Sequence, residues 1–225
     1  MTYFDFPKNE MTGYSPKAFI EGLFKPALFT EKGTEDEKIA ILLNSKNKNK
    51  KLTIIENEKN REYLYKQLME MYYSSIYALA INKQWGIKFD IIASDSPDIF
   101  FVNEADENDR VAIEIYEAYN FEEKEKVNQV DIAKEVKKLN TKKGNKNYPM
   151  KSRLLVINRI NSTVGGFNIS EYCRELNRYI WSFSCIILCV FTKTERKYTF
   201  FHLYPVEMKD LQFNFSTKDD GKYWY

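Results

Sequence analysis

Two short apolar runs with a polar segment between them constrain the fold of this chain more than any other feature. Residues 96–102 read Ser-Pro-Asp-Ile-Phe-Phe-Val, and residues 111–118 read Val-Ala-Ile-Glu-Ile-Tyr-Glu-Ala. The polar residues 103–110 predict a turn, so we expect the two runs to pair as a β-hairpin. This pairing would place Asp98 close to Glu114 on one sheet, and two adjacent carboxylates repel unless a cation lies between them.

The order of elements from residue 57 onward predicts an α/β domain with a mixed β-sheet flanked by helices. Helices are predicted over residues 57–83, 122–143 and 170–181, the last beginning at a Ser170 cap. Besides the hairpin, strands are predicted over residues 88–93, 154–157, 185–191 and 198–203. Strands interleaved with helices form layers, and the hairpins make the sheet mixed rather than purely parallel.

The chain divides into an N-terminal extension, residues 1–56, and one α/β domain, residues 57–225. Within the extension, Ser15-Pro16 is a typical helix start, and residues 52–55 read as a short strand. The most apolar stretch, residues 182–191, is too short to cross a membrane. No signal-peptide pattern is visible at Met1, so a cytoplasmic location and no membrane partner are expected.

The histidine and cysteine content excludes several kinds of site. The chain has one histidine, His202, so metal centres built on several histidines are excluded, and a structural role is expected for it. The three cysteines match no zinc spacing, and Cys185 and Cys189, which lie in an apolar run, are expected to be buried free thiols. Net charge is only +2, so charge alone indicates no partner and local clusters have to be considered instead.

The element order, with acids on the second and third strands, resembles the PD-(D/E)XK nuclease superfamily, which shares an αβββαβ core. The likeness covers about residues 57–160: Pro97-Asp98 stands where the family has Pro-Asp, and Glu114-Ile115-Tyr116 where it has Asp/Glu-x-Lys. The resemblance implies a restriction-endonuclease-like fold. It also implies a metal-dependent endonuclease that hydrolyses phosphodiester bonds in DNA, with RNA as an alternative substrate and restriction or phage defence as the setting.

The residues themselves support a site for a hard cation. Alternation along the third strand places Glu114 and Tyr116 on the face opposite Ile113 and Ile115. The carboxylates of Asp98 and Glu114, with the backbone carbonyl of Ile115, would form an oxygen-only site suited to Mg²⁺ or Mn²⁺. Such an ion can activate water and stabilise charge on a phosphate.

The position of the family's lysine holds Tyr116, and a phenol with a pKa of about 10 is a poor base at neutral pH. Family members differ in where the lysine comes from, and three lysines of the next predicted helix are candidates: Lys124, Lys126 and Lys134. Glu117 is a further candidate, and an acid of the first helix could complete the site, either Glu62 or Glu70. The predicted catalytic residues are Asp98, Glu114, Tyr116, Glu117 and Lys134.

A cluster of basic residues in and after the second helix could bind the phosphates of a nucleic acid. Its members are Lys134, Lys137, Lys138, Lys142, Lys143, Lys146, Lys151 and Arg153. Arg174 and Arg178 on the later helix are weaker candidates, and the alternative for all of them is a solvated surface. Two other functions stay open: a catalytically inactive module of the same fold that binds nucleic acid or protein, and a homodimer formed through the aromatic C-terminal part.

Overall fold

The computed structural model describes residues 15–17, 58–94, 97–118, 131–144, 146–149, 151–158, 168–192 and 197–216. A long helix, α3 (Glu58–Trp85), begins the α/β unit and ends before Gly86, which has a φ of +71° that a glycine adopts without strain. Helical residues 16–17 follow Ser15, as expected, and the rest of the N-terminal extension lies outside the described residues. The predicted helix over residues 57–83 is confirmed.

Seven strands form one mixed sheet in sequence order, β1 to β7. Their bounds are β1 Phe89–Ala93, β2 Ile99–Asn103, β3 Asp106–Glu117, β4 Arg153–Asn158, β5 Cys185–Thr192, β6 Lys197–Tyr204 and β7 Gln212–Ser216. Strands β3, β4 and β5 are mutually parallel, and the other neighbours pair antiparallel. The α/β class and the mixed sheet are therefore confirmed.

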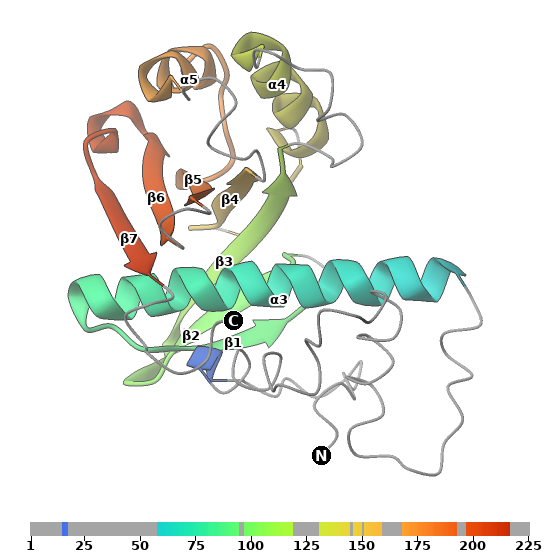
Figure 1. Cartoon of the computed structure of the whole chain (residues 1–225), viewed down its shortest axis with the longest axis vertical. Helices are drawn as coiled ribbons and strands as arrows, with labels where there is room; N and C mark the ends of the chain where they lie inside the picture. The colour runs from blue at the N-terminus through green and yellow to red at the C-terminus, as the bar shows by residue number, and fades with distance from the viewer. Residues whose placement is uncertain are drawn as a thin grey trace.

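Helices cover both faces of this sheet (Figure 1). On one face, α3 packs on a core that draws residues from all seven strands, including Ile113 and Ile115. On the other face, α4 (Ile132–Leu139) and α5 (Ile169–Leu176) pack on β3 to β6 over a second core. Strands β4 and β5 are almost continuous apolar runs because both of their faces are buried.

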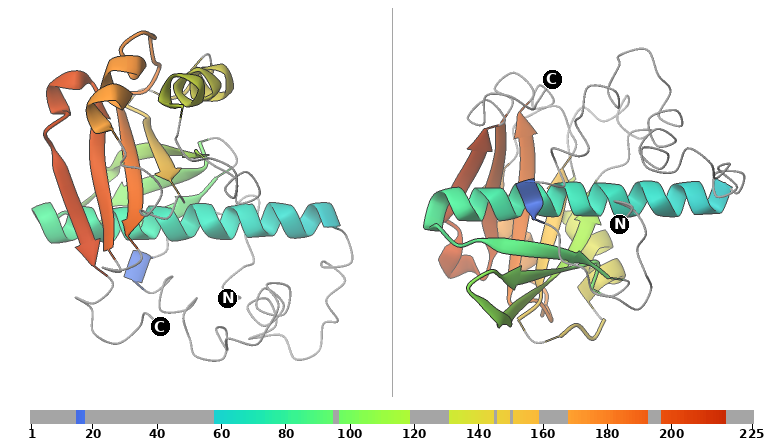
Figure 2. Two further views of the ribbon diagram at one scale, coloured as in Figure 1. Left: turned by 45° about the horizontal axis from the view of Figure 1, so that its top comes forward. Right: turned by 90° about the horizontal axis from the view of Figure 1, so that it is seen from below.

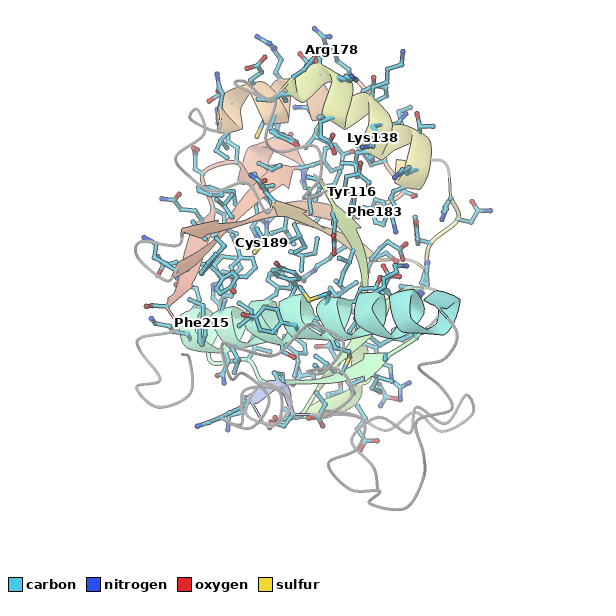
Figure 3. All side chains as sticks on the ribbon, turned by 45° about the vertical axis from the view of Figure 1, so that its right-hand side comes forward. Tyr116, Lys138, Arg178, Phe183, Cys189 and Phe215 are labelled. Atoms are coloured by element: carbon cyan, nitrogen blue, oxygen red, sulfur yellow. The ribbon has the colours of Figure 1, made fainter. Side chains whose placement is uncertain are left out.

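The sheet curls around α3, which contacts β1 and β2 near one edge and β7 at the other (Figure 2). The side chains labelled in Figure 3 follow this layering: Cys189 and Phe215 belong to the core under α3, and Tyr116 and Phe183 to the core under α4 and α5. The expected alternation along β3 is confirmed, because Ile113 and Ile115 lie in the first core and Tyr116 in the second.

Several boundaries differ from the predictions. The turn between β2 and β3 is only Glu104-Ala105, because residues 106–110, expected in the turn, extend β3 as an exposed ribbon. The helix predicted over 122–143 is described only from Ile132, capped by Asp131, and residues 119–130 lie outside the described residues. Asn168 rather than Ser170 caps α5, which ends at Leu176 rather than near Trp181. Strand β7 was not predicted.

The expectation for Cys185 and Cys189 is confirmed: both are buried free thiols, and so is Cys173. The structural role expected for His202 stays a prediction, since its buried Nε2 has no hydrogen-bond partner among the described residues. His202 is buried, and its Nδ1 lies 3.2 Å from the Sγ of Cys185. Burial raises the pKa of Cys185 to about 11 and lowers that of His202 to about 4, so the two groups face each other uncharged at neutral pH. No helix in the described part of the chain is long and apolar enough to span a membrane.

Candidate active site

The β2–β3 hairpin brings Asp98 and Glu114 together. Ile99 pairs with Ile113, so Asp98, which directly precedes Ile99, lies opposite Glu114 across the two strands. Both side chains are buried, with exposed fractions of 7% for Asp98 and 5% for Glu114. Asp98 is fixed by the backbone, because its Oδ2 accepts a hydrogen bond of 2.8 Å from the amide of Ile115.

A single ammonium group lies between these two carboxylates. Lys143 Nζ forms an ion pair with Glu114 Oε1 and a second one, at 3.8 Å, with Asp98 Oδ2. Only 14% of the Lys143 side chain is exposed, so water screens these interactions weakly. The two acids thus share one cation, as their proximity requires, and in the structure that cation comes from the protein.

A local change in helix geometry supplies Lys143. Helix α4 continues into η3 (Asn140–Gly144), a turn of π-helix that is wider than an α-helical turn. Lys142 remains exposed in this turn, whereas Lys143 extends into the interior toward the acids. Gly144 closes the turn, and the side chain of Asn140 occupies the place that a Cβ at position 144 would need.

Tyr148, in the loop between η3 and β4, contacts the same carboxylate. Its hydroxyl donates a hydrogen bond of 3.2 Å to Glu114 Oε1. Burial, and then the negative charge of Glu114, raise the pKa of this phenol, so it stays protonated and remains a donor. The second oxygen of Glu114, Oε2, is buried and has no hydrogen-bond partner among the described residues.

Helix α3 contributes a third acid, Glu70, which is 8% exposed. Its Oε1 lies 3.2 Å from Nζ of Lys66, one helical turn earlier. Burial, reinforced by the charge of nearby Asp98, raises the pKa of Glu70 from 4.5 to about 7. Glu70 thus lies near Asp98, but its expected role of completing the site stays a prediction, and the side chain of the alternative, Glu62, lies outside the described residues.

When all of its acids are ionised, this cluster has an excess of negative charge that a divalent cation could balance. Above the raised pKa of Glu70, of about 7, Asp98, Glu114 and Glu70 together carry three negative charges against two positive charges on Lys66 and Lys143, a net charge of −1. Burial also raises the pKa of Asp98, despite the opposing effect of Lys143. A buried excess of carboxylate with an unpaired oxygen on Glu114 is a donor set that fits Mg²⁺.

The carboxylates do not form a complete ligand shell. Within the described ranges, no three acidic, cysteine or histidine side chains are grouped closely enough to hold a metal ion by themselves. Two carboxylates nevertheless suit Mg²⁺, which keeps several waters and often takes its remaining ligands from substrate phosphates. The predicted third ligand is the backbone carbonyl of Ile115. The amide of the same residue donates the hydrogen bond to Asp98.

The other predicted catalytic residues lie farther along β3 and on α4. Tyr116 is buried under α4, where its hydroxyl donates to Glu135 Oε1 at 3.0 Å and Lys142 Nζ lies 5.8 Å from its ring centroid. Glu117 is exposed at the end of β3, and Lys134 is exposed in the first turn of α4. These positions give Tyr116 a packing role, and catalytic roles for Tyr116, Glu117 and Lys134 stay predictions. Lys124 and Lys126, the alternatives to Lys134, lie outside the described residues.

The predicted basic cluster separates into an outer and an inner group. Exposed members on and after α4 are Lys134, Lys137, Lys138, Lys142, Lys146 and Lys151, and Figure 3 shows Lys138 among them. Arg153 is half-buried, and its guanidinium donates to the hydroxyl of Tyr77 at 3.4 Å. Lys143 belongs to the acid cluster. Arg174 and Arg178 both form ion pairs with the buried carboxylate of Glu175.

Comparison with protein-family models, with curated proteins and with solved structures found no match to this chain. Its function therefore has to be inferred from the residues of the site and their geometry.

Proposed function

We propose that this protein is a metal-dependent nuclease that hydrolyses phosphodiester bonds in DNA. The observation that carries the proposal is the convergence of two buried carboxylates, Asp98 and Glu114, on one cationic group, Lys143. Two buried carboxylates that face each other repel, and the single positive charge of Lys143 balances only one of them when both are ionised, so a further cation would stabilise the pair. Burial raises the pKa of Asp98 and of nearby Glu70, and acids with a raised pKa gathered in one place are candidates for a functional site.

The arrangement of elements supports a restriction-endonuclease-like fold. Helix α3 is followed by the antiparallel strands β1, β2 and β3, then by α4 and by β4 parallel to β3, which is an αβββαβ order. Asp98 directly precedes the second strand of this unit and Glu114 lies on the third, where the resemblance to the PD-(D/E)XK superfamily expects acids. The later strands β5 to β7 would then be additions to that core.

In the proposed mechanism, Asp98 and Glu114 would hold Mg²⁺ or Mn²⁺, with the carbonyl of Ile115 as a further ligand. The chemistry that such an ion supplies when bound is activation of water and neutralisation of charge on the phosphate. Lys143 takes the place of the lysine missing at Tyr116: its ammonium, already next to both carboxylates, contacts the scissile phosphate and stabilises the negative charge that develops there.

The exposed lysines of α4 and the following loop would hold the DNA backbone over this site. Lys134, Lys137 and Lys138 project from α4, the helix that leads directly into the turn with Lys143. Each lysine that contacts a phosphate releases condensed counterions, so binding should weaken steeply as salt concentration rises. Such contacts bind without reading sequence, and RNA therefore stays an alternative substrate.

Cleavage assays with matched variants test this proposal. The protein is incubated with plasmid DNA, linear DNA and RNA, in Mg²⁺, in Mn²⁺ and in EDTA. Metal-dependent cleavage is expected from the wild type. Replacing either ligand, by Asp98→Asn or Glu114→Gln, should abolish it, and Asp106→Asn, at an exposed position of β3, should leave it unchanged. Absence of metal-dependent cleavage of all three substrates would contradict the proposal.

A second candidate is a catalytically inactive nucleic-acid-binding module of the same fold. This alternative is favoured by Tyr116, which stands at the family's lysine position but packs under α4. In such an inactive module, Lys143 would serve only to neutralise the acids. Salt-dependent binding of DNA without cleavage, unchanged by Asp98→Asn, would support this alternative against the first.

A further inference from the structure

Among the described residues, Glu114 has hydrogen-bond and ion-pair partners at one of its two carboxylate oxygens only. Oε1 accepts the hydrogen bond of the Tyr148 hydroxyl at 3.2 Å and also the ion pair of Lys143. Oε2 is buried and has no hydrogen-bond partner among the described residues. A buried carboxylate oxygen without a partner is costly, so this asymmetry needs an explanation.

The loop that carries Tyr148 is fixed on its far side. The ring of Tyr148 packs on Phe183, with 4.5 Å between ring centroids, and Phe183 is buried in the core under α4 and α5. Pro149 O accepts hydrogen bonds from both the amide and the hydroxyl of Ser152, at 3.1 Å and 2.6 Å. Ser152 O in turn accepts from the amide of Ser184 at 2.8 Å. Tyr148 therefore donates its hydrogen bond to Glu114 from a loop that is itself held in place by packing and hydrogen bonds.

We propose that Tyr148 is a positioning residue: with Lys143 it holds Oε1 of Glu114, and it thereby directs Oε2 toward a hard divalent cation. This inference rests on the proposed function and assigns a role to a residue outside the predicted catalytic set. Carboxylates that ligate metals are usually themselves hydrogen-bonded, and loss of such a partner typically weakens metal binding by 10- to 100-fold.

Removing the phenol hydroxyl changes the competition for Glu114. Without it, Lys143 is the one described residue that still restrains the carboxylate, so the side chain can turn and offer both oxygens to the ammonium. Oε2 is then no longer reserved for the divalent cation. Because a phenylalanine at position 148 would keep the ring contact with Phe183, the loss falls on the hydrogen bond rather than on packing.

Isothermal titration of the full chain with Mg²⁺ tests the inference without reference to catalysis. Tyr148→Phe should weaken Mg²⁺ binding about tenfold while leaving the thermal midpoint measured in EDTA close to that of the wild type. Tyr198→Phe is the matched control: it removes a phenol that lies 2.6 Å from the hydroxyl of Tyr72 and should leave the Mg²⁺ affinity unchanged.

The outcomes separate this inference from the proposed function. If Tyr148→Phe binds Mg²⁺ as tightly as the wild type, the positioning role is overturned, whether or not the protein cleaves DNA. If binding weakens but the wild type cleaves no nucleic acid, the positioning role stands and the nuclease proposal fails. If the wild type binds no Mg²⁺, both are overturned.

Discussion

Replacement of Lys143 by methionine should destabilise the metal-free protein strongly. The variant keeps the length and much of the apolar surface of the side chain but removes the only charge between Asp98 and Glu114 among the described residues. At the 3.8 Å that separates Nζ from Asp98 Oδ2, a pair of unit charges attracts by about 4 kcal/mol at an effective dielectric constant of 20. Removing one partner of a buried ion pair costs roughly 3–5 kcal/mol, and we expect a loss in this range.

Urea denaturation at pH 8 in EDTA measures the loss. With a typical slope for a small domain, the midpoint should fall by roughly 2 M. Lys138→Met is the control, because Lys138 is exposed on α4 and its replacement should have little effect. Addition of Mg²⁺ should restore more stability to Lys143→Met than to the wild type, since the ion replaces the missing positive charge.

The reasoning predicts a particular dependence on pH and metal. At pH 5 the destabilisation should be smaller than at pH 8, because protonation of the carboxyl groups removes part of the repulsion between Asp98 and Glu114. If Lys143→Met is as stable as Lys138→Met in EDTA at pH 8, the ammonium does not neutralise this acid pair, and the electrostatic account of the site is refuted.

Three further predictions concern the acid of α3, the start of α4 and the lysine surface. Because the pKa of Glu70 is raised to about 7 in the folded protein, from 4.5 without the fold, the wild type should lose stability in EDTA as pH rises between these values. Glu70→Gln should remove that loss and be more stable than the wild type at pH 8, by on the order of 2 kcal/mol; equal differences in urea denaturation at pH 5 and pH 8 would contradict this. Asp131→Ala removes a cap that accepts from the amide of Lys134 at 2.9 Å and should cost about 1 kcal/mol in the same assay, so an unchanged midpoint would count against the cap. Replacing Lys134, Lys137 and Lys138 together by glutamine should reduce the slope of log affinity for DNA against log salt by about 3, and an unaltered slope would place the DNA elsewhere.

Much of the sheet could be predicted from sequence because its pattern is local. The runs over β4 and β5 are apolar throughout, which indicates strands buried on both faces, and the alternation over residues 111–116 correctly separates the two faces of β3. The pairing of Asp98 with Glu114 followed from the hairpin, although the turn is shorter than expected. Strand β7 was missed although Gln212–Ser216 alternates polar and apolar residues, because the run is only five residues long and follows an irregular segment.

The partners of the acids could not be predicted in the same way. Lys142 and Lys143 are adjacent and chemically identical, and only the π-helical turn decides that one is exposed and the other extends to the carboxylates. Tyr148 lies in a loop without periodicity, so no pattern connects it with Glu114. Glu70 was one of two alternatives on α3, and the tertiary packing of the helix brings it near Asp98.

The π-helical turn at η3 makes the site sensitive to chain length as well as to residue identity. A π turn holds one more residue than the α-helical turn it replaces, and each residue of an α-helix rotates the side-chain direction by about 100°. If η3 became α-helical with all of its residues kept, the direction of Lys143 would rotate away from the acids while every carboxylate stayed unaltered. The match between the number of residues in η3 and the width of its turn thus sets the charge balance of the site without any substitution among its acids.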